Sequence, residues 1–348
     1  MADAPDAVTA MVVAVNRQIV EVLLDDGRIE RCRLHGRYRD EALHGDGVVV
    51  GDRAVLGAWP TAPAPGAPLP LRVVVAIRPR ATALRRHPTG RTDGRLHPDQ
   101  TVAANVDLCL VVQAYRDPAF RAATADRLLV IARTSGVAPL LVLNKCEGAG
   151  ASDLEPILAP YRAAGVEAFA VSAHSGEGIA GLHARLAGHL AVLLGPSGVG
   201  KSALTSVLSP TSTPVVGAVS AARLRAGRGR HTTVQSRLYP LPDGGCIIDT
   251  AGIRSLGVAA GTAYEEAFPE IAALAAGCRF SDCTHTAEPG CAVRAAMEQG
   301  RLAAQTYRGF LRIREDLAGR PVGRGFTRRG GRARPGPRGR EDVDDDAR

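Results

Sequence analysis

Lysine, aromatic residues and long apolar runs are scarce in this chain. Lysine occurs only at Lys145 and Lys201, so all but two of the 43 basic residues are arginine. Aromatic residues make up 4% of the 348 residues, which makes base stacking a minor term in any binding to nucleic acid. No stretch approaches about 18 uninterrupted apolar residues, and the first residues lack the basic-then-apolar order of a secretory signal. We therefore expect a soluble, cytoplasmic protein with no membrane partner.

Cysteine is also thin, and it is unevenly spread. The seven cysteines are an odd number and three of them lie within 14 residues, which argues against a disulfide framework and for a reducing compartment. The segment Cys278-x4-Cys283-x-His285-x5-Cys291 supplies three thiolates and one imidazole, the donor set of a closed tetrahedral zinc site. We expect one structural Zn²⁺ there; the alternative is a group of buried cysteines with an incidental histidine. The other four cysteines lie in apolar or strand-edge contexts and are interpreted as core residues or as residues without a role: Cys32, Cys109, Cys146 and Cys246.

Acidic residues are outnumbered by basic ones. The net charge is +8, and residues 341–348 are mostly acidic, so the rest of the chain is more basic still. Such an excess indicates a polyanionic partner such as nucleic acid, or only a well-solvated surface. Residues 78–95, 223–237 and 324–340 are arginine-rich candidate contacts to RNA, mostly to phosphate.

The pattern along the chain predicts several domains. Residues 11–77 hold short β segments, among them 48–50, which predict a small barrel such as an oligonucleotide-binding (OB) fold, or another small β domain. From about residue 100 to 249 apolar strands alternate with helical stretches, which predicts a mostly parallel sheet covered on both faces. We expect an OB-like β barrel over 1–85, an α/β P-loop domain over 86–258, a helical zinc-binding domain over 259–320 and a disordered tail over 321–348.

Residues 195–202 carry a phosphate-binding pattern. They match G-x-x-x-x-G-K-[ST] between an apolar run at 191–194 and a helical stretch, which is the context that this loop requires. Backbone N–H groups of such a loop wrap the phosphates at a helix N-terminus. Lys201 would bridge the β- and γ-phosphates and take part in catalysis, and Ser202 would bind Mg²⁺. The expected nucleotide-binding residues here are Gly195, Pro196, Ser197, Gly198, Val199, Gly200, Lys201 and Ser202.

A second pair of segments resembles the base-reading motifs of GTPases. Asn144-Lys145-Cys146-Glu147 ends a predicted strand and resembles Asn-Lys-x-Asp, whose carboxylate accepts hydrogen bonds from guanine N1–H and its exocyclic amine. Glu147 in place of Asp keeps the acceptor pair and changes its reach. Ser172-Ala173 resembles the partner motif whose backbone binds the guanine oxygen. A P-loop ATPase or kinase with a fortuitous Asn-Lys motif is the competing interpretation.

Two further segments are candidates for magnesium binding and catalysis. Asp249-Thr-Ala-Gly252 follows a predicted strand, so Asp249 can reach Mg²⁺ through water and the Gly252 N–H can contact the γ-phosphate. Thr232 or Thr233 can complete the magnesium coordination, and the preceding His231 either orients the attacking water or has a structural or RNA-contact role. An isoleucine follows Gly252 where many GTPases carry a water-positioning glutamine, so intrinsic hydrolysis should be slow.

The order of the motifs is unusual, because the base motifs precede the phosphate loop. A circular permutation keeps such a site intact, since the strands can pair identically while the termini move to another surface loop. The chain resembles the RsgA (YjeQ) family in five features taken together. These are the permuted order, the segments Gly-x-Gly-x-His-Thr-Thr and Asp-Thr-Ala-Gly-Ile-Arg, a predicted β barrel before the GTPase motifs and a zinc cluster after them. The resemblance spans about residues 10–318 and implies a bacterial GTPase that uses Mg²⁺ with GTP.

The resemblance also implies a role and partners. RsgA proteins act in late maturation of the small (30S) ribosomal subunit and are stimulated by it, so we expect binding to that subunit and its rRNA, release on GTP hydrolysis, and a monomeric protein. Two alternatives remain open: an RNA-binding module with an inactive nucleotide site, and a permuted GTPase of large-subunit assembly. The C-terminal position of the zinc cluster argues against the second.

Overall fold

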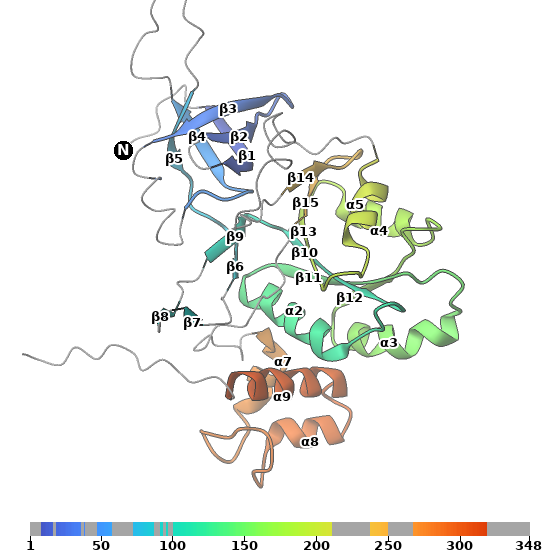
Figure 1. Ribbon diagram of the computed structural model, residues 1–348. Coiled ribbons are helices and arrows are strands. Elements are labelled where there is room, and N and C mark those ends of the chain that lie inside the picture. The colour runs from blue at the N-terminus through green and yellow to red at the C-terminus, as the bar shows by residue number, and fades with distance from the viewer. Residues whose placement is uncertain are drawn as a thin grey trace, which may run out of the picture.

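The computed structural model has three parts, a barrel, a sheet covered by helices, and a small helical unit (Figure 1). It describes residues 8–16, 19–35, 38, 47–57, 72–86, 91–92, 95–96, 100–210, 237–249 and 267–318. Among the described helices none is both long and apolar enough to cross a bilayer.

The amino-terminal part is a closed five-stranded barrel. Its strands are β1 (Val8–Asn16), β2 (Ile19–Leu23), β3 (Ile29–Leu34), β4 (Arg53–Gly57) and β5 (Val73–Ile77). They pair in the order β1-β2-β3-β5-β4, and β1 pairs with β4 to close the barrel. Alternate side chains such as Val20 and Val22 point into the barrel core, as the two-residue period of a strand requires. The predicted OB-like β barrel is confirmed.

One predicted strand of the barrel is wrong. Residues 48–50 form no strand among the described elements, although they are three valines. Val49 N–H donates to the Asp52 carboxylate at 2.9 Å, and Gly51 has a φ of +91°, so the chain turns here. A left-handed glycine and an aspartate that binds the backbone favour a turn more strongly than a short valine run favours a strand.

A hairpin links the barrel to the sheet. Strand β6 (Ala83–Arg86) pairs with β9 (Gln100–Ala104), and β7 (Arg91–Thr92) pairs with β8 (Arg95–Leu96). Arg80, just before β6, donates to both oxygens of the fully buried Asp52 at 2.7 and 2.9 Å. This buried ion pair attaches the hairpin to the barrel.

The central part is a six-stranded sheet with helices on both faces. The strand order is β12-β11-β10-β13-β15-β14, and only β14 is antiparallel to its neighbour. The strands are β10 (Leu108–Ala114), β11 (Ala138–Asn144), β12 (Glu167–Ala170), β13 (Leu190–Leu194), β14 (Arg237–Pro240) and β15 (Cys246–Asp249). Buried side chains of α2 (Ala122–Thr134) and α3 (Ala151–Ala163) pack on one face, and those of α4 (Ile179–Leu186) and α5 (Lys201–Leu208) pack on the other. The predicted α/β architecture is confirmed, whereas β14 was not foreseen.

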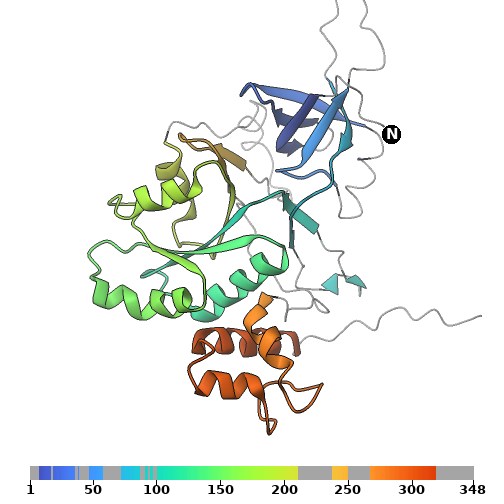
Figure 2. The ribbon, with the colours of Figure 1, turned by 180° about the vertical axis from the view of Figure 1, so that it is seen from behind.

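The helical unit continues the core of the sheet. It contains α7 (Pro269–Ala275), α8 (Ala292–Glu298) and α9 (Ala304–Ala318). Phe310 and Ile313 of α9 belong to the same apolar cluster as Val111 and Leu141 of the sheet. Figures 1 and 2 show α2 and α3 lying between the sheet and this unit.

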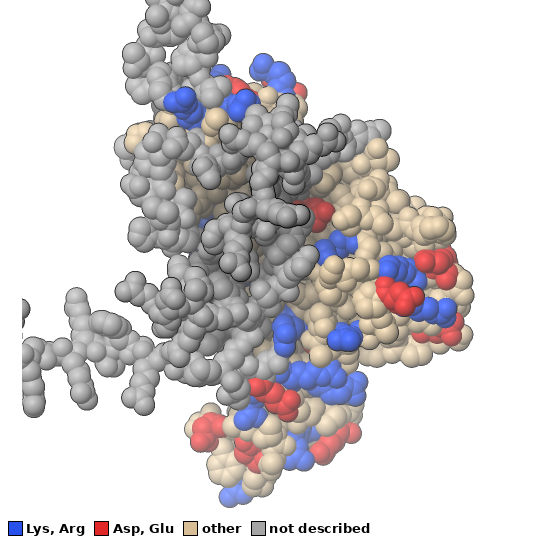
Figure 3. Space-filling model, in the orientation of Figure 1, with Lys and Arg blue, Asp and Glu red and all other residues tan. Residues whose placement is uncertain are grey.

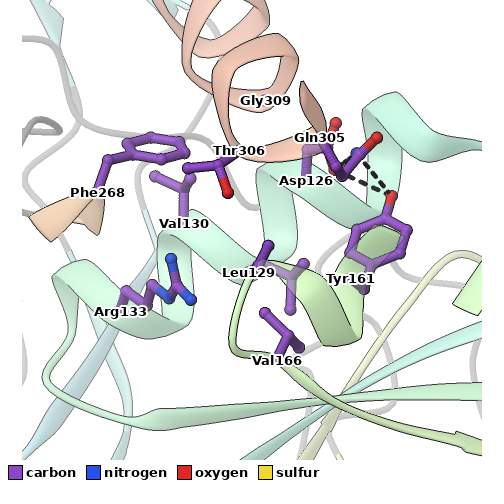
Figure 4. A pocket seen from close by; sticks show the side chains of 11 residues that line it. Asp126, Leu129, Val130, Arg133, Tyr161, Val166, Phe268, Gln305, Thr306 and Gly309 are labelled. Carbon is purple, nitrogen blue, oxygen red and sulfur yellow. Dashed lines mark hydrogen bonds between the residues drawn. The ribbon is translucent and has the colours of Figure 1, made fainter. Parts of the chain in front are cut away.

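Polar side chains also fix α9 onto the sheet's helices. Asp126 of α2, which is 5% exposed, accepts hydrogen bonds from Tyr161 of α3 at 3.0 Å and from Gln305 of α9 at 2.7 Å (Figure 4). Arg312 of α9 forms a salt bridge with the same carboxylate. Burial raises the pKa of Asp126, against the effect of these donors. The network borders a cavity of about 30 Å³ between α2, α3 and α9, room for a water molecule.

Candidate nucleotide site and metal centre

The phosphate loop lies at the carboxyl end of β13, one of the two central strands of the sheet. Strand β13 ends at Leu194, residues 195–200 turn, and α5 begins at Lys201, which is the strand–loop–helix arrangement expected from the sequence. Gly200 has a φ of +92°, and a Cβ there would lie 2.3 Å from Asn144 Nδ2. The loop therefore passes directly against the base motif, and only glycine fits at this contact.

Lys201 is half-buried and held by its own loop. Its Nζ donates to the carbonyl oxygens of Gly195 at 2.9 Å and Pro196 at 2.8 Å. Burial lowers the pKa of Lys201, and the nearby Asp249 carboxylate opposes this shift. The ammonium group is thus fixed at the mouth of the loop, close to the end of β15.

Asn144 joins three of the predicted segments. It ends β11 and is 1% exposed. Its Nδ2 donates to Val199 O of the phosphate loop at 2.9 Å, and its Oδ1 accepts from Ala173 N–H at 3.0 Å. The phosphate loop, the base motif and the Ser172–Ala173 segment therefore meet at one side chain, although they are far apart in the chain.

Glu147 and Ser172 form a hydrogen-bonded pair beside Asn144. The Ser172 hydroxyl accepts from the backbone N–H groups of His174 at 3.2 Å and Ser175 at 3.0 Å, so its single proton is available to the Glu147 carboxylate, 2.7 Å away. This bond lowers the pKa of Glu147. The exposed carboxylate is thereby held ionised and in one place, despite its extra methylene.

The loop after β10 also lines this region, although no motif in the sequence marks it. Lys145, with a φ of +61°, donates from Nζ to the carbonyl oxygen of Asp117. Pro118 Cδ lies 3.7 Å from the position that a Cβ on Gly198 would take. Residues 117–118 therefore contact both the base motif and the phosphate loop. An exposed Asp-Pro turn gives no signal of this in the sequence, because only the sheet order brings it there.

Part of the predicted magnesium and catalytic set can be placed. Asp249 ends β15 and is 7% exposed, and Ser202 is an exposed residue in the first turn of α5. Oxygen donors of this kind fit Mg²⁺. His231, Thr232, Thr233 and Gly252 lie outside the described residues.

The predicted zinc ligands come together in the helical unit. The ligand atoms of Cys278, Cys283, His285 and Cys291 lie within 4.8 Å of one another, and His285 Nδ1 is 3.6 Å from the sulfur atoms of Cys278 and Cys291. A tetrahedral zinc with usual bond lengths places sulfur and nitrogen about 3.5 Å apart. The donor set and its spacing therefore fit a structural zinc. The remaining cysteines are buried, as predicted for core residues.

The backbone of the metal loop, residues 278–291, is held by hydrogen bonds from two side chains. The Glu288 carboxylate accepts from the Thr284 hydroxyl and from the N–H groups of Thr284, Thr286 and Ala287, the last three at 2.9 to 3.1 Å. These bonds, the one from the Thr284 hydroxyl first, lower the pKa of Glu288. Tyr307 of α9 donates to His285 O at 2.7 Å. No sequence pattern marks Glu288, because its partners are backbone groups and one hydroxyl of the same loop.

A phosphate loop on a central strand, contacted by a base motif that precedes it in the chain, defines a circularly permuted P-loop GTPase. Comparisons with known proteins agree. The family model described as RsgA GTPase matches residues 77–259. A protein of Gemmatimonas aurantiaca, "Small ribosomal subunit biogenesis GTPase RsgA", is 37% identical over 322 residues, 90% of this chain and 98% of that one. A protein of the same name from Pseudomonas syringae pv. tomato is 39% identical over 83% of this chain and 78% of its own.

Solved structures share the fold. YjeQ from Thermotoga maritima matches with a TM-score of 0.66 and 24% identity, over 90% of this chain and 99% of its own. YloQ, titled a circularly permuted GTPase, matches with a TM-score of 0.64 and 23% identity, over 91% and 98%. The chain belongs to the RsgA GTPase family and is a GTP hydrolase.

Proposed function

We propose that this GTP hydrolase acts in late maturation of the small ribosomal subunit, binds that subunit through its rRNA, and is released on GTP hydrolysis. The observation that carries the proposal is the position of Asn144, which ties the phosphate loop to both base-reading segments. Relatives named for small-subunit biogenesis, similar over most of their length, supply the biological context.

The proposed roles follow from the chemistry of each side chain. Lys201 would bind the β- and γ-phosphates through an ammonium group that its loop already orients. Mg²⁺, bound with GTP, would neutralise phosphate charge, and Ser202 and Asp249 would hold it, with Thr232 or Thr233. Gly252 would contact the γ-phosphate.

Guanine recognition is proposed for the pair formed by Glu147 and Ser172. A carboxylate accepts two hydrogen bonds from guanine N1–H and its amine, which adenine cannot donate in that arrangement. Because Ser172 occupies Oε2 at 2.7 Å, the pair presents the carboxylate in a fixed orientation. Lys145 and Ala173 complete the proposed guanine-binding site.

The proposed switch lies, apart from Asp249, in segments beyond the described residues. GTP would order residues 231–233 and 249–254, and their release after hydrolysis would loosen subunit binding. His231 is proposed to orient the attacking water. Equal affinity of the small subunit for the GDP form and for a form with a non-hydrolysable GTP analogue would contradict the switch.

The arginine-rich stretches are the proposed contacts to rRNA phosphates, and the protein is proposed to work as a cytoplasmic monomer. Residues 223–236 and 324–340 lie outside the described part of the chain, as does part of 78–95. Phosphate contacts make binding fall steeply with salt. A salt series of subunit affinity therefore tests them.

The test of the proposed function is phosphate release from GTP with and without purified small subunits. We expect slow release alone and faster release with small subunits, little effect of large subunits, and a loss of about 100-fold or more in Lys201→Ala. Release absent under all conditions would favour an RNA-binding module with an inactive site. Stimulation by large subunits alone would point to the other ribosomal subunit.

A further inference from the structure

One aromatic side chain of the metal loop faces the solvent. Phe280 is 41% exposed, and it is the one aromatic among the large apolar side chains that are well exposed in the described ranges. Single exposed apolar side chains are common on protein surfaces, so a role for Phe280 depends on its neighbours, an adjacent guanidinium group and a hydrogen-bonded loop.

The loop holds Phe280 firmly in this position. It lies between two of the metal ligands, Cys278 and Cys283. Arg279 N–H donates to Gly290 O at 3.2 Å, and Cys283 N–H donates to Phe280 O at 3.3 Å. Phe280 is therefore exposed on a loop whose backbone is held by hydrogen bonds on both sides of it.

A guanidinium group lies over the ring. Arg279 Cζ is 5.5 Å from the centroid of Phe280, within the range of a cation–π contact. Aromatic rings and guanidinium planes are the two side-chain surfaces on which unpaired bases stack. The pair therefore offers a flat, partly cationic surface on the loop between Cys278 and Cys283.

The charge around the pair favours bases over phosphates. Asp282 is exposed and Glu288 is partly buried on the same loop, and acidic and basic groups mix over the helical unit (Figure 3). The Glu288 carboxylate is occupied by N–H groups of its own loop, so it does not neutralise Arg279 by pairing with it in the described contacts. Without a surplus of positive charge, this loop cannot bind RNA chiefly through phosphates.

We propose that Arg279 and Phe280 form a stacking platform for one unpaired nucleobase of small-subunit rRNA. This inference rests on the proposed function, because it takes the ribosomal RNA as the partner. It adds a contact that differs from the arginine-rich stretches in kind: its contribution does not depend on counterion release, so it survives at high salt.

The experiment measures the affinity of purified small subunits for the zinc-loaded full chain with a non-hydrolysable GTP analogue. Phe280→Ala should weaken binding by about 5- to 150-fold, the usual loss for one stacked base. Phe280→Tyr should bind like the native protein, because the ring remains. Phe280→Leu, the matched apolar control, should be as weak as the alanine variant, and the slope of affinity against salt should not change in any of them.

Three outcomes would overturn the proposal. Equal affinity of Phe280→Ala and the native protein for small subunits would rule out the stacking contact. The proposed function would still hold in that case, provided that the native protein binds small subunits and is stimulated by them. Retained binding by Phe280→Leu would indicate an apolar pocket of a ribosomal protein. Absence of subunit binding by the native protein would defeat the proposed function together with the platform. Zinc content and basal GTP hydrolysis, unchanged in all variants, show that each one is folded.

Discussion

Removing the Asp126 carboxylate should loosen α9 from α2 and α3. In Asp126→Ala, Tyr161 and Gln305 lose a buried acceptor at 3.0 and 2.7 Å, and Arg312 loses its counter-ion. Breaking a buried ion pair from one side costs about 3–5 kcal/mol. The Arg312 side chain is 36% exposed and regains water, so we expect a smaller loss of stability, about 2–4 kcal/mol.

Hydrogen exchange on the amides of α9 measures this loss where it occurs. The expected result is faster exchange across α9, with GTP affinity within about twofold of the native value, since Asp126 lies outside the proposed nucleotide site. Asp126→Asn is the matched control, because it keeps an oxygen acceptor for Tyr161 and Gln305. Its α9 exchange rates should lie between those of the native protein and those of Asp126→Ala. Unchanged α9 protection in Asp126→Ala would refute the assignment of this network as the attachment of the helical unit.

Three other perturbations test the sites themselves. Gly200→Ala would place a Cβ 2.3 Å from Asn144 Nδ2 at a φ of +92°, so GTP affinity, measured by calorimetry, should fall by about 10-fold or more, whereas native affinity would contradict the close approach. Ser172→Ala removes the bond that lowers the pKa of Glu147, so the carboxylate becomes protonated at a higher pH than in the native protein. Because the carboxylate binds guanine only when ionised, the acid-side loss of GTP affinity should move to higher pH in this variant. An unchanged pH profile would argue against a role of this pair in guanine binding. Zinc removal by a chelator should expose α8 and α9 to proteolysis and spare the barrel, and intact α8 and α9 after complete zinc loss would argue against a structural metal.

The motifs could be read from the sequence because each has a local pattern. Glycine spacing before Lys201, and the cysteine and histidine spacing in residues 278–291, carry their chemistry within a few residues of one another. The alternation of apolar strands with helices likewise predicted the central sheet. In these regions local preference and the final fold agree.

What the sequence could not predict depends on contacts between distant segments. The Asp117 carbonyl accepts a hydrogen bond from Lys145, and the Asp126 carboxylate accepts one from Gln305. Both contacts depend on how the strands and helices pack. The turn at residues 49–52 was mistaken for a strand because its decisive interaction, the Asp52 side chain on the backbone, is invisible in a run of valines. The roles of the nucleotide-site residues, and the domain boundaries, stay predictions.

The two lysines of this chain, Lys145 and Lys201, are proposed to bind one guanine nucleotide. The most direct measurement is a competition titration in which GTP, GDP and ATP displace a fluorescent GDP from the native protein in the presence of Mg²⁺. We expect displacement by both guanine nucleotides, with ATP weaker by about 100-fold or more. Equal displacement by ATP, or no binding of the fluorescent nucleotide, would contradict it.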